Sequence, residues 1–180
     1  MVCFWWERIL TQKEFKQLRS KEFWISCICM ERKVKTPCVG VCSTVFGDQV
    51  CRGCKRFQHE VIEWNGYSDF EKETVWNRLE ALKVLIMKSK ITVKDETLLK
   101  TKLDALDISY YEKVDPYCWV FDLIKQASQS ITDLKEFGVQ PLFKSTTNLV
   151  DLKQLIEEEL FTLSEAHYQR YFRLEDNYRA

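Results

Sequence analysis

Apolar residues recur at intervals of three and four along most of the chain after residue 60, a spacing typical of amphipathic helices. The clearest run begins at Ser68, which is three residues before Glu71, the spacing of a capping box. We expect a helix from there to about Lys88. Its core-facing stripe consists of Phe70, Trp76, Leu79, Leu82, Val84, Leu85 and Ile86. A shorter helix over residues 60–64 is expected just before it, with Trp64 in the core.

Cap signals predict further helices beyond residue 90. Asp95 is placed to cap a helix that carries Leu98, Leu99, Leu103 and Leu106. Asp115-Pro116 begins another, because proline suits the first turn of a helix. A short extended piece is expected over residues 108–111, between these two helices.

The last third of the chain carries two more start signals. Asn148 precedes an apolar-periodic run over residues 149–161, and Thr162 with Glu165 forms a second capping box. We therefore expect two successive helices there, the second ending near Tyr178, and a plain connection over residues 138–143.

Composition agrees with a mainly α protein. The 180 residues include only five glycines and three prolines, while 46% are apolar. We expect a small four-cysteine metal-knuckle module followed by an α-helical domain. The boundaries are an N-terminal extension over residues 1–35, the cysteine module with its following helices over 36–89, and a helical domain of unknown role over 90–180.

Four cysteines define the candidate chemistry. Cys38, Cys42, Cys51 and Cys54 have the spacing C-x3-C-x8-C-x2-C. Two cysteines separated by two or three residues can turn both sulphurs toward one point, and a second pair completes four-thiolate ligation of a metal. The alternative is two disulfides or four unpaired thiols. Disulfides require an oxidising compartment, and no secretory segment is evident, so the pattern favours metal.

The residues around these cysteines resemble a known family. The segments 36–42 (TPCVGVC), 51–56 (CRGCKR) and 60–64 (EVIEW) are similar to the bacterial family called domain of unknown function 1289, over about residues 36–79. Its members are short cysteine-rich proteins described as predicted iron–sulphur proteins. Lys55 departs from the family pattern, in which a small glycine is common there, and Phe57 stands where a hydroxyl residue is common. The resemblance implies a metal or cluster site and supplies no established activity.

The identity of the metal stays open. Zinc is favoured by the compact arrangement of two cysteine pairs, since structural zinc sites are closed tetrahedra. An iron–sulphur cluster also takes four cysteines, and the family's description indicates one. Cys27 and Cys29 are left out of the ligand set because four thiolates already close the site.

The N-terminal residues allow two interpretations. Residues 1–29 come either from an upstream start site, with Met30 as the true start, or form an amphipathic helix over residues 11–23. Charged residues interrupt their apolar clusters, so we expect neither a transmembrane helix nor a signal peptide, no membrane partner, and a cytoplasmic location.

Charge is divided unevenly along the chain. Residues 1–60 hold 11 of the 27 basic residues and 6 of the 27 acidic ones. This excess permits a nucleic acid, a protein or another anionic partner at the cysteine module, although ordinary surface variation explains it too. The residues that would face such a partner are Lys33, Lys35, Arg52, Lys55 and Arg56.

No catalytic constellation is visible, which favours a non-enzymatic protein. His59 and His167 stand in no ligand or nucleophile motif, residues 157–159 (EEE) suggest a solvated acidic face, and Cys118 suggests a core position. The sequence thus predicts a metal-stabilised binding or adaptor module. Two alternatives remain: an iron–sulphur electron-transfer or redox-sensing protein, and a protein-interaction domain with a purely structural metal site.

Overall fold

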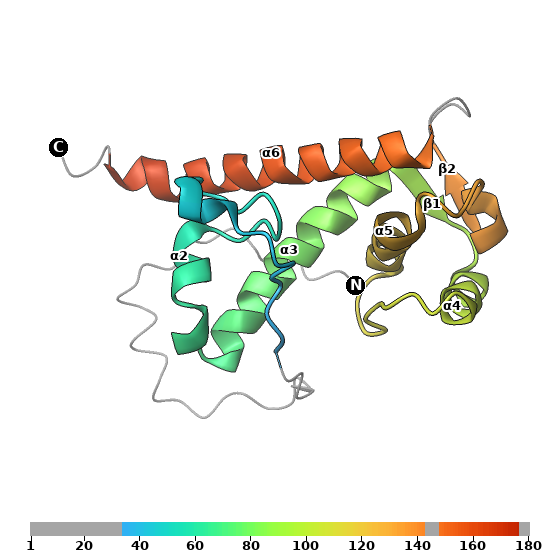
Figure 1. Ribbon diagram of the computed structural model, residues 1–180, viewed down its shortest axis with the longest axis horizontal. Coiled ribbons are helices and arrows are strands. Elements are labelled where there is room, and N and C mark those ends of the chain that lie inside the picture. Colours follow the sequence, from blue (N-terminus) through green and yellow to red (C-terminus); the bar gives the residue numbers. More distant parts are fainter. Residues whose placement is uncertain (1–33, 143–147, 177–180) are drawn as a thin grey trace, which may run out of the picture. The chain divides into compact units, whose positions relative to one another are not determined.

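The computed structural model describes residues 34–142 and 148–176, with side chains described as far as residue 172. All of these residues belong to one compact unit, Lys33–Ala180. Of the N-terminal extension over residues 1–35, only Val34 and Lys35 are described. The helix expected over residues 11–23 therefore lies outside the described residues, as do Cys27, Cys29 and Lys33. The described part is mainly α-helical, as expected (Figure 1).

Helices make up most of the described chain. They are α2 (Gln58–Ile62), α3 (Asp69–Lys90), α4 (Glu96–Ala105), α5 (Pro116–Ala127) and α6 (Leu149–Asp176). Short 3₁₀ turns lie at Ser43–Phe46, Trp64–Gly66 and Leu134–Phe137. None of the helices in the described ranges is long and apolar enough to cross a membrane.

The expected caps define most helix starts. The backbone N–H of Glu71 donates to Ser68 Oγ over 3.3 Å, and Ser68 N–H donates to Glu71 Oε2 over 2.8 Å, a reciprocal capping box. Asp95 Oδ1 accepts from the N–H of Leu98 at the start of α4, over 2.9 Å. Asp115 Oδ1 accepts from Tyr117 N–H at the start of α5, over 3.0 Å. These three predicted starts are confirmed.

Two expectations beyond residue 90 are wrong. The connection predicted over residues 138–143 contains a strand, β2 (Val139–Pro141), which pairs antiparallel with β1 (Ile91–Val93). The two helices predicted after Asn148 are one continuous helix, α6, so Thr162 and Glu165 form no cap. The helix continues because buried residues stay in register through residue 162: Leu152, Ile156, Leu160 and Ser164.

The predicted stripe of α3 is partly wrong. Phe70 and Leu85 are 62% and 59% exposed, while Val75 and Met87 lie in the core instead. The main core joins the second half of α3 to α4, α5 and α6. A smaller cluster of Trp64, Val75 and Leu79 lies where the first half of α3 meets the cysteine module. Trp64 therefore has the core position expected for it.

Figure 1 shows α6 running past both the cysteine module and α3. Ion pairs fix this arrangement at two places. Lys55 of the module pairs with Glu157 of α6, and Lys90 at the end of α3 pairs with Glu159 over 2.6 Å. The sequence predicts residues 157–159 as a solvated acidic face, but two of these three glutamates anchor α6 to other elements.

Candidate metal centre

The two cysteine loops pack directly against each other. A Cβ placed on Gly53, in the second loop, would lie 2.5 Å from the carbonyl oxygen of Val41 in the first, which is too close for any side chain. The N–H of Arg52 also donates to Ser43 Oγ over 2.8 Å. Glycine at position 53 is therefore required for the loops to touch, and not for an unusual backbone angle. Gly40, by contrast, has a φ of +88°, as its place in a tight turn requires.

Cys51 lies at the centre of this contact. Its side chain is buried, and burial alone would raise its pKa. Hydrogen bonds from the backbone N–H groups of Cys54, Ser43 and Gly53, together with the Cys54 thiol, overcome that effect and lower the pKa to about 7. Backbone amides directed at a cysteine sulphur favour the thiolate, which is the form that binds a metal.

Cys54 has a different environment. Burial raises its pKa, although the guanidinium of Arg56 favours the thiolate. Arg56 Nε donates to Cys54 Sγ over 3.3 Å. A charged donor therefore faces a sulphur that is neutral in the metal-free chain.

The first pair is less enclosed. Cys38 is exposed, and its Sγ accepts from its own loop at Gly40 N–H over 3.4 Å. Cys42 Sγ lies 3.0 Å from Thr44 Oγ1. All four cysteines are free thiols, so the described residues contain no disulfide between them, which was one alternative to a metal site. Within residues 34–142 and 148–176, no three Cys, His, Asp or Glu side chains converge closely enough to hold a metal ion.

Two buried arginines test whether these residues suit a metal–thiolate centre. Arg56 and Arg78 each have a buried Nη1 with no hydrogen-bond partner among the described residues. Arg56 lies against Cys54, and Cys54 is among the charges that act on Arg78. A divalent ion with four thiolates carries two negative charges, which the guanidinium of Arg56 beside Cys54 and the unpartnered Nη1 donors of both arginines would stabilise. The donor set and its surroundings fit a thiolate-bound metal.

Arg78 is held by a carboxylate and a ring. Its Nη2 donates to Glu60 Oε2 over 2.6 Å, and its guanidinium carbon lies 3.8 Å from the centre of the Phe57 ring. Burial lowers the pKa of Arg78, although Glu60 favours the charged form. Glu60 also accepts from the N–H of Phe57 over 2.8 Å. Arg78 thus connects α3 to the turn that follows the cysteines.

Lys55 combines a positive φ with a buried, fully engaged side chain. Lys55 has a φ of +62°, in the left-handed region where glycine is favoured. Its side chain is buried, and Nζ donates to the carbonyl of Arg52 over 2.6 Å and to that of Gly53 over 3.4 Å. It also pairs with Glu157 of α6. The lysine therefore adopts a backbone conformation that is unfavourable for it, and its side chain links the cysteine loop to α6.

Aromatic contacts continue this link along α6. The Phe57 ring lies 5.3 Å from the Tyr168 ring and 5.7 Å from the Phe172 ring. The Tyr168 hydroxyl hydrogen-bonds to Gln49 Oε1 over 2.7 Å. Phe57 thus supplies the apolar partner for α6.

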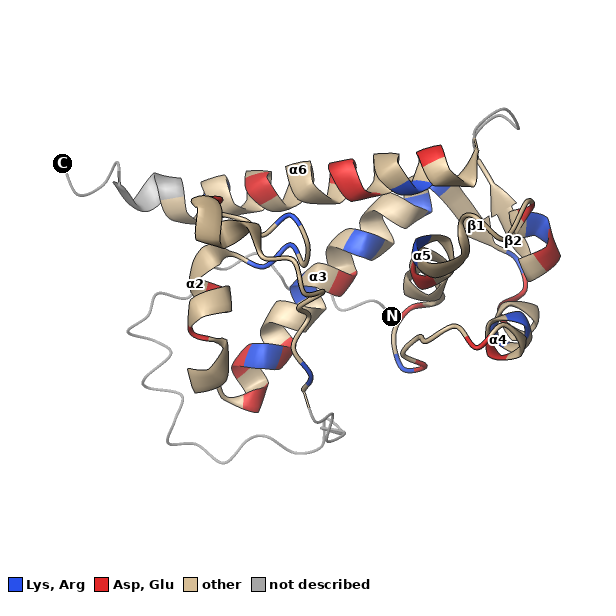
Figure 2. Cartoon of the chain, viewed as in Figure 1, with Lys and Arg blue, Asp and Glu red and all other residues tan. Residues whose placement is uncertain are grey.

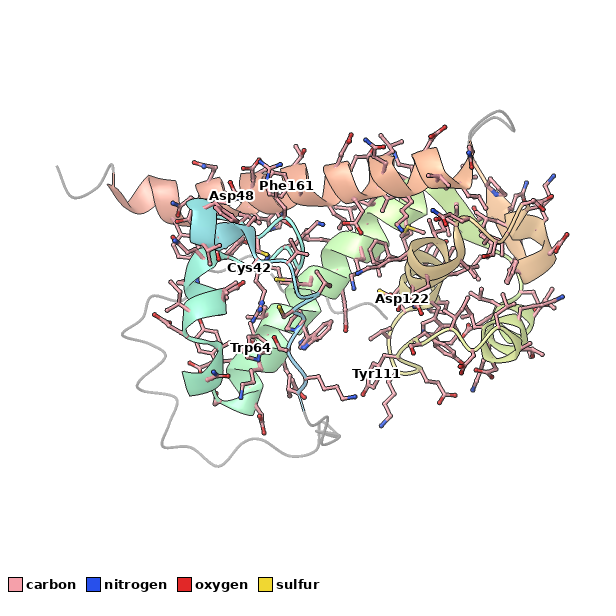
Figure 3. The ribbon with its side chains drawn as sticks, in the orientation of Figure 1. Cys42, Asp48, Trp64, Tyr111, Asp122 and Phe161 are labelled. Atoms are coloured by element: carbon pink, nitrogen blue, oxygen red, sulfur yellow. The ribbon has the colours of Figure 1, made fainter. Side chains whose placement is uncertain are left out.

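The cations predicted to face a partner are mostly engaged within the chain. Lys55 and Arg56 are buried. Arg52 pairs with Asp48 over 3.0 Å, and its guanidinium lies 4.4 Å from the centre of the Phe161 ring of α6. Figure 3 shows Asp48 and Phe161 at this contact, and Figure 2 shows acidic residues along α6 beside the basic residues of the loops. Of the four predicted residues that the structure describes, Lys35 alone is both exposed and without an ion pair in the described ranges.

The remaining candidates take structural places. His59 packs on Phe172, with ring centres 4.9 Å apart. His167 lies on α6, where burial lowers its pKa, next to the ring of Tyr171. Cys118 is buried in α5, and burial raises its pKa to about 12, so it is a core thiol, as the sequence predicts.

The fold and these contacts define a helical protein with a pair of interlocked cysteine loops. Residues 36–83 match the model of the family described as "Protein of unknown function (DUF1289)", so this segment belongs to that family, as the resemblance predicts. No curated protein and no solved structure matches the chain. The family segment ends within α3, so α4, α5 and α6 lie beyond it.

Proposed function

We propose that this protein binds a metal through Cys38, Cys42, Cys51 and Cys54, and that the metal stabilises a small protein-binding module. The observation that carries the proposal is the pair of buried guanidinium groups, Arg56 and Arg78, whose Nη1 atoms have no partner among the described residues. Buried N–H donors without an acceptor are costly, and metal-bound thiolates close by would supply acceptors with negative charge.

Zinc is the favoured ion. Zinc–thiolate sites with two cysteine pairs are closed tetrahedra, and binding supplies folding free energy to a short loop. In that arrangement Cys51 and Cys54 bind from the second loop. Cys38 and Cys42 would bind from the first loop, where the bond from Gly40 N–H to Cys38 Sγ favours the thiolate.

The partner favoured by the surface is a protein. Lys55 and Arg56 are buried, which removes much of the cationic surface that a nucleic acid would need. The outer face of the cysteine loops is apolar instead: Val41, Val45 and Phe46 are 71%, 74% and 89% exposed. Adjacent exposed apolar side chains are typical of protein-interaction surfaces.

The test of the metal begins with its identity. Protein purified without air is assayed for zinc, iron and acid-labile sulphide, with a visible spectrum. We expect about one zinc per chain and no colour. Iron with sulphide and a visible absorption band would support the alternative, a redox protein with an iron–sulphur cluster. Cys42→Ser should lose the metal and Cys118→Ala, the matched control, should keep it.

The test of the binding role uses photo-crosslinking in the native host. A photoreactive amino acid is placed at Phe46 or, as a control, at Leu142, which is also exposed but lies just after β2. We expect a discrete crosslinked protein at position 46 alone, and its loss when the module carries Cys42→Ser. The same products at both positions would contradict a binding surface on the loops.

A further inference from the structure

A cavity of about 340 Å³ lies among the cysteine loops, α3, α5, α6 and the segment before α5. Its volume is at the lower end of the range for small-ligand sites. Cys54 is at one side, and the other walls include Trp76, Tyr111, Asp122 and Ser164. Figure 3 shows Asp122 on α5 and Tyr111 in the segment that precedes it.

Opposite charges line this cavity without pairing directly. Lys83, Lys125 and Asp122 all contribute to its wall. In the described part of the chain, none of their charged groups has a hydrogen bond or a partner within ion-pair distance, although both lysines attract the Asp122 carboxylate. Burial raises the pKa of that carboxyl group, so it lacks much of its hydration.

Aromatic rings stand between the charges. The Lys83 ammonium lies 5.0 Å from the centre of the Phe121 ring and 5.9 Å from that of Trp76, and the Lys125 ammonium lies 6.0 Å from Phe121. The lysines are therefore placed by cation–π contact and keep their hydrogen-bond donors available. Glu80 and the Lys55–Glu157 pair complete the charged wall, which carries equal numbers of cations and anions.

Ser164 adds an independent indication of a ligand. Its side chain is 0% exposed, lines the cavity, and its hydroxyl has no hydrogen-bond partner among the described residues. A buried hydroxyl without a partner is uncommon in folded proteins and calls for an explanation. A polar group of a bound molecule would supply the missing hydrogen bond.

We propose that this cavity binds a small zwitterion with an apolar body, of the amino-acid class. The carboxylate of the ligand binds between Lys83 and Lys125, its ammonium group binds Asp122, and its apolar part packs against the aromatic walls. An anion alone would leave Asp122 unpaired, and a cation alone would leave the lysines unpaired. This site is separate from metal binding, although Cys54 borders it.

Three matched probes test the proposal on the full-length chain by ligand-observed NMR titration. They are L-phenylalanine, 3-phenylpropionate, which lacks the ammonium group, and phenethylamine, which lacks the carboxylate. We expect phenylalanine to bind at least about tenfold more tightly than either partial analogue, because each analogue leaves one buried charge unpaired. No saturable binding of phenylalanine up to about 10 mM, or equal binding of either analogue, would overturn the proposal.

Substitutions in the cavity should change the affinities of the probes in opposite directions, which a cavity without specificity would not show. Lys83→Met should weaken the binding of phenylalanine roughly ten- to hundredfold. Asp122→Asn should weaken the binding of phenylalanine and strengthen that of 3-phenylpropionate. Ser164→Leu should block every probe by filling the cavity. Lys102→Met, on the exposed surface of α4, should change no affinity by more than about twofold.

Metal content and circular dichroism are measured on the same samples, so that loss of the metal or of the fold is not mistaken for loss of this site. Parallel weakening of all three probes by Asp122→Asn in a folded sample would also refute the assigned roles.

Discussion

Lys55 combines a strained backbone with a buried charge, and two substitutions separate these contributions. Lys55→Met removes the ammonium group and keeps a side chain at a φ of +62°. Lys55→Gly removes the same group and also removes the strain. Both variants lose the contacts with the carbonyls of Arg52 and Gly53 and with Glu157.

The expected magnitudes follow from these contacts. Hydrogen bonds to charged groups contribute about 1.5–3 kcal/mol to stability. The Glu157 side chain is 31% exposed and regains water when the lysine is lost, so we expect Lys55→Met to lower the free energy of unfolding by about 2 kcal/mol. A non-glycine residue in the left-handed region costs roughly 1–2 kcal/mol, and glycine removes this cost. Glycine also gives the unfolded chain more conformational freedom, which offsets part of the stability gained. Lys55→Gly should therefore be about 1 kcal/mol more stable than Lys55→Met.

Urea unfolding followed by tryptophan fluorescence measures the difference, which corresponds to a midpoint shift of about 0.5 M between the two variants. All samples are brought to the same metal content. Lys100→Met is the control, because its pair with Glu112 lies on the surface and should contribute little to stability. A glycine variant as unstable as the methionine variant, or less stable, would refute the account of Lys55.

Three further changes test the buried polar groups by urea unfolding. Glu60→Gln should lower the free energy of unfolding by about 3 kcal/mol, because it leaves the buried Arg78 without its carboxylate, and a loss below about 1 kcal/mol would contradict this. Ser164→Ala should raise it by about 1 kcal/mol, since a buried hydroxyl without a partner is removed, and a clear loss of stability would show that the hydroxyl is bonded. Burial raises the pKa of Asp122, so the folded chain keeps this proton at pH values where the unfolded chain has released it. Stability should therefore fall as pH rises from about 4 toward the folded pKa, and Asp122→Asn should reduce that slope, whereas an unchanged slope would assign it to other groups.

Short-range signals in the sequence were sufficient for most helix starts. The cap at Ser68 and the Asp115-Pro116 start each depend on residues within one turn, so the pattern and the contact coincide. The capping-box pattern at Thr162 and Glu165 gave a wrong prediction of a second helix start. No glycine or proline interrupts α6 there, and the buried stripe through Leu160 and Ser164 keeps the helix continuous.

Long-range features could not be predicted in this way. The strands β1 (Ile91–Val93) and β2 (Val139–Pro141) have three residues each, too few for an alternating pattern to be recognised. Their pairing joins segments that are distant in sequence. The exposure of Phe70 has the same origin, because only packing decides which apolar residues of a helix face the core.

The candidate site likewise combines local features, which the sequence predicts, with contacts between distant residues, which it does not. Cysteine spacing is local, and the contact between the two loops agrees with it. The contribution of Arg78 depends on Glu60, eighteen positions earlier, and that of Lys55 on Glu157 in α6. From sequence, Lys55 is recognisable only as an expected departure from the family pattern, and its positive φ is one that glycine adopts more easily.

X-ray absorption at the metal edge tests the central claim most directly, because it counts and identifies the bound atoms in the intact protein. The account predicts four sulphur atoms about 2.3 Å from a zinc ion, and fewer sulphurs or no metal in Cys51→Ser. A spectrum dominated by nitrogen or oxygen ligands, or a wild-type protein that retains no metal after purification without air, would contradict a four-thiolate centre.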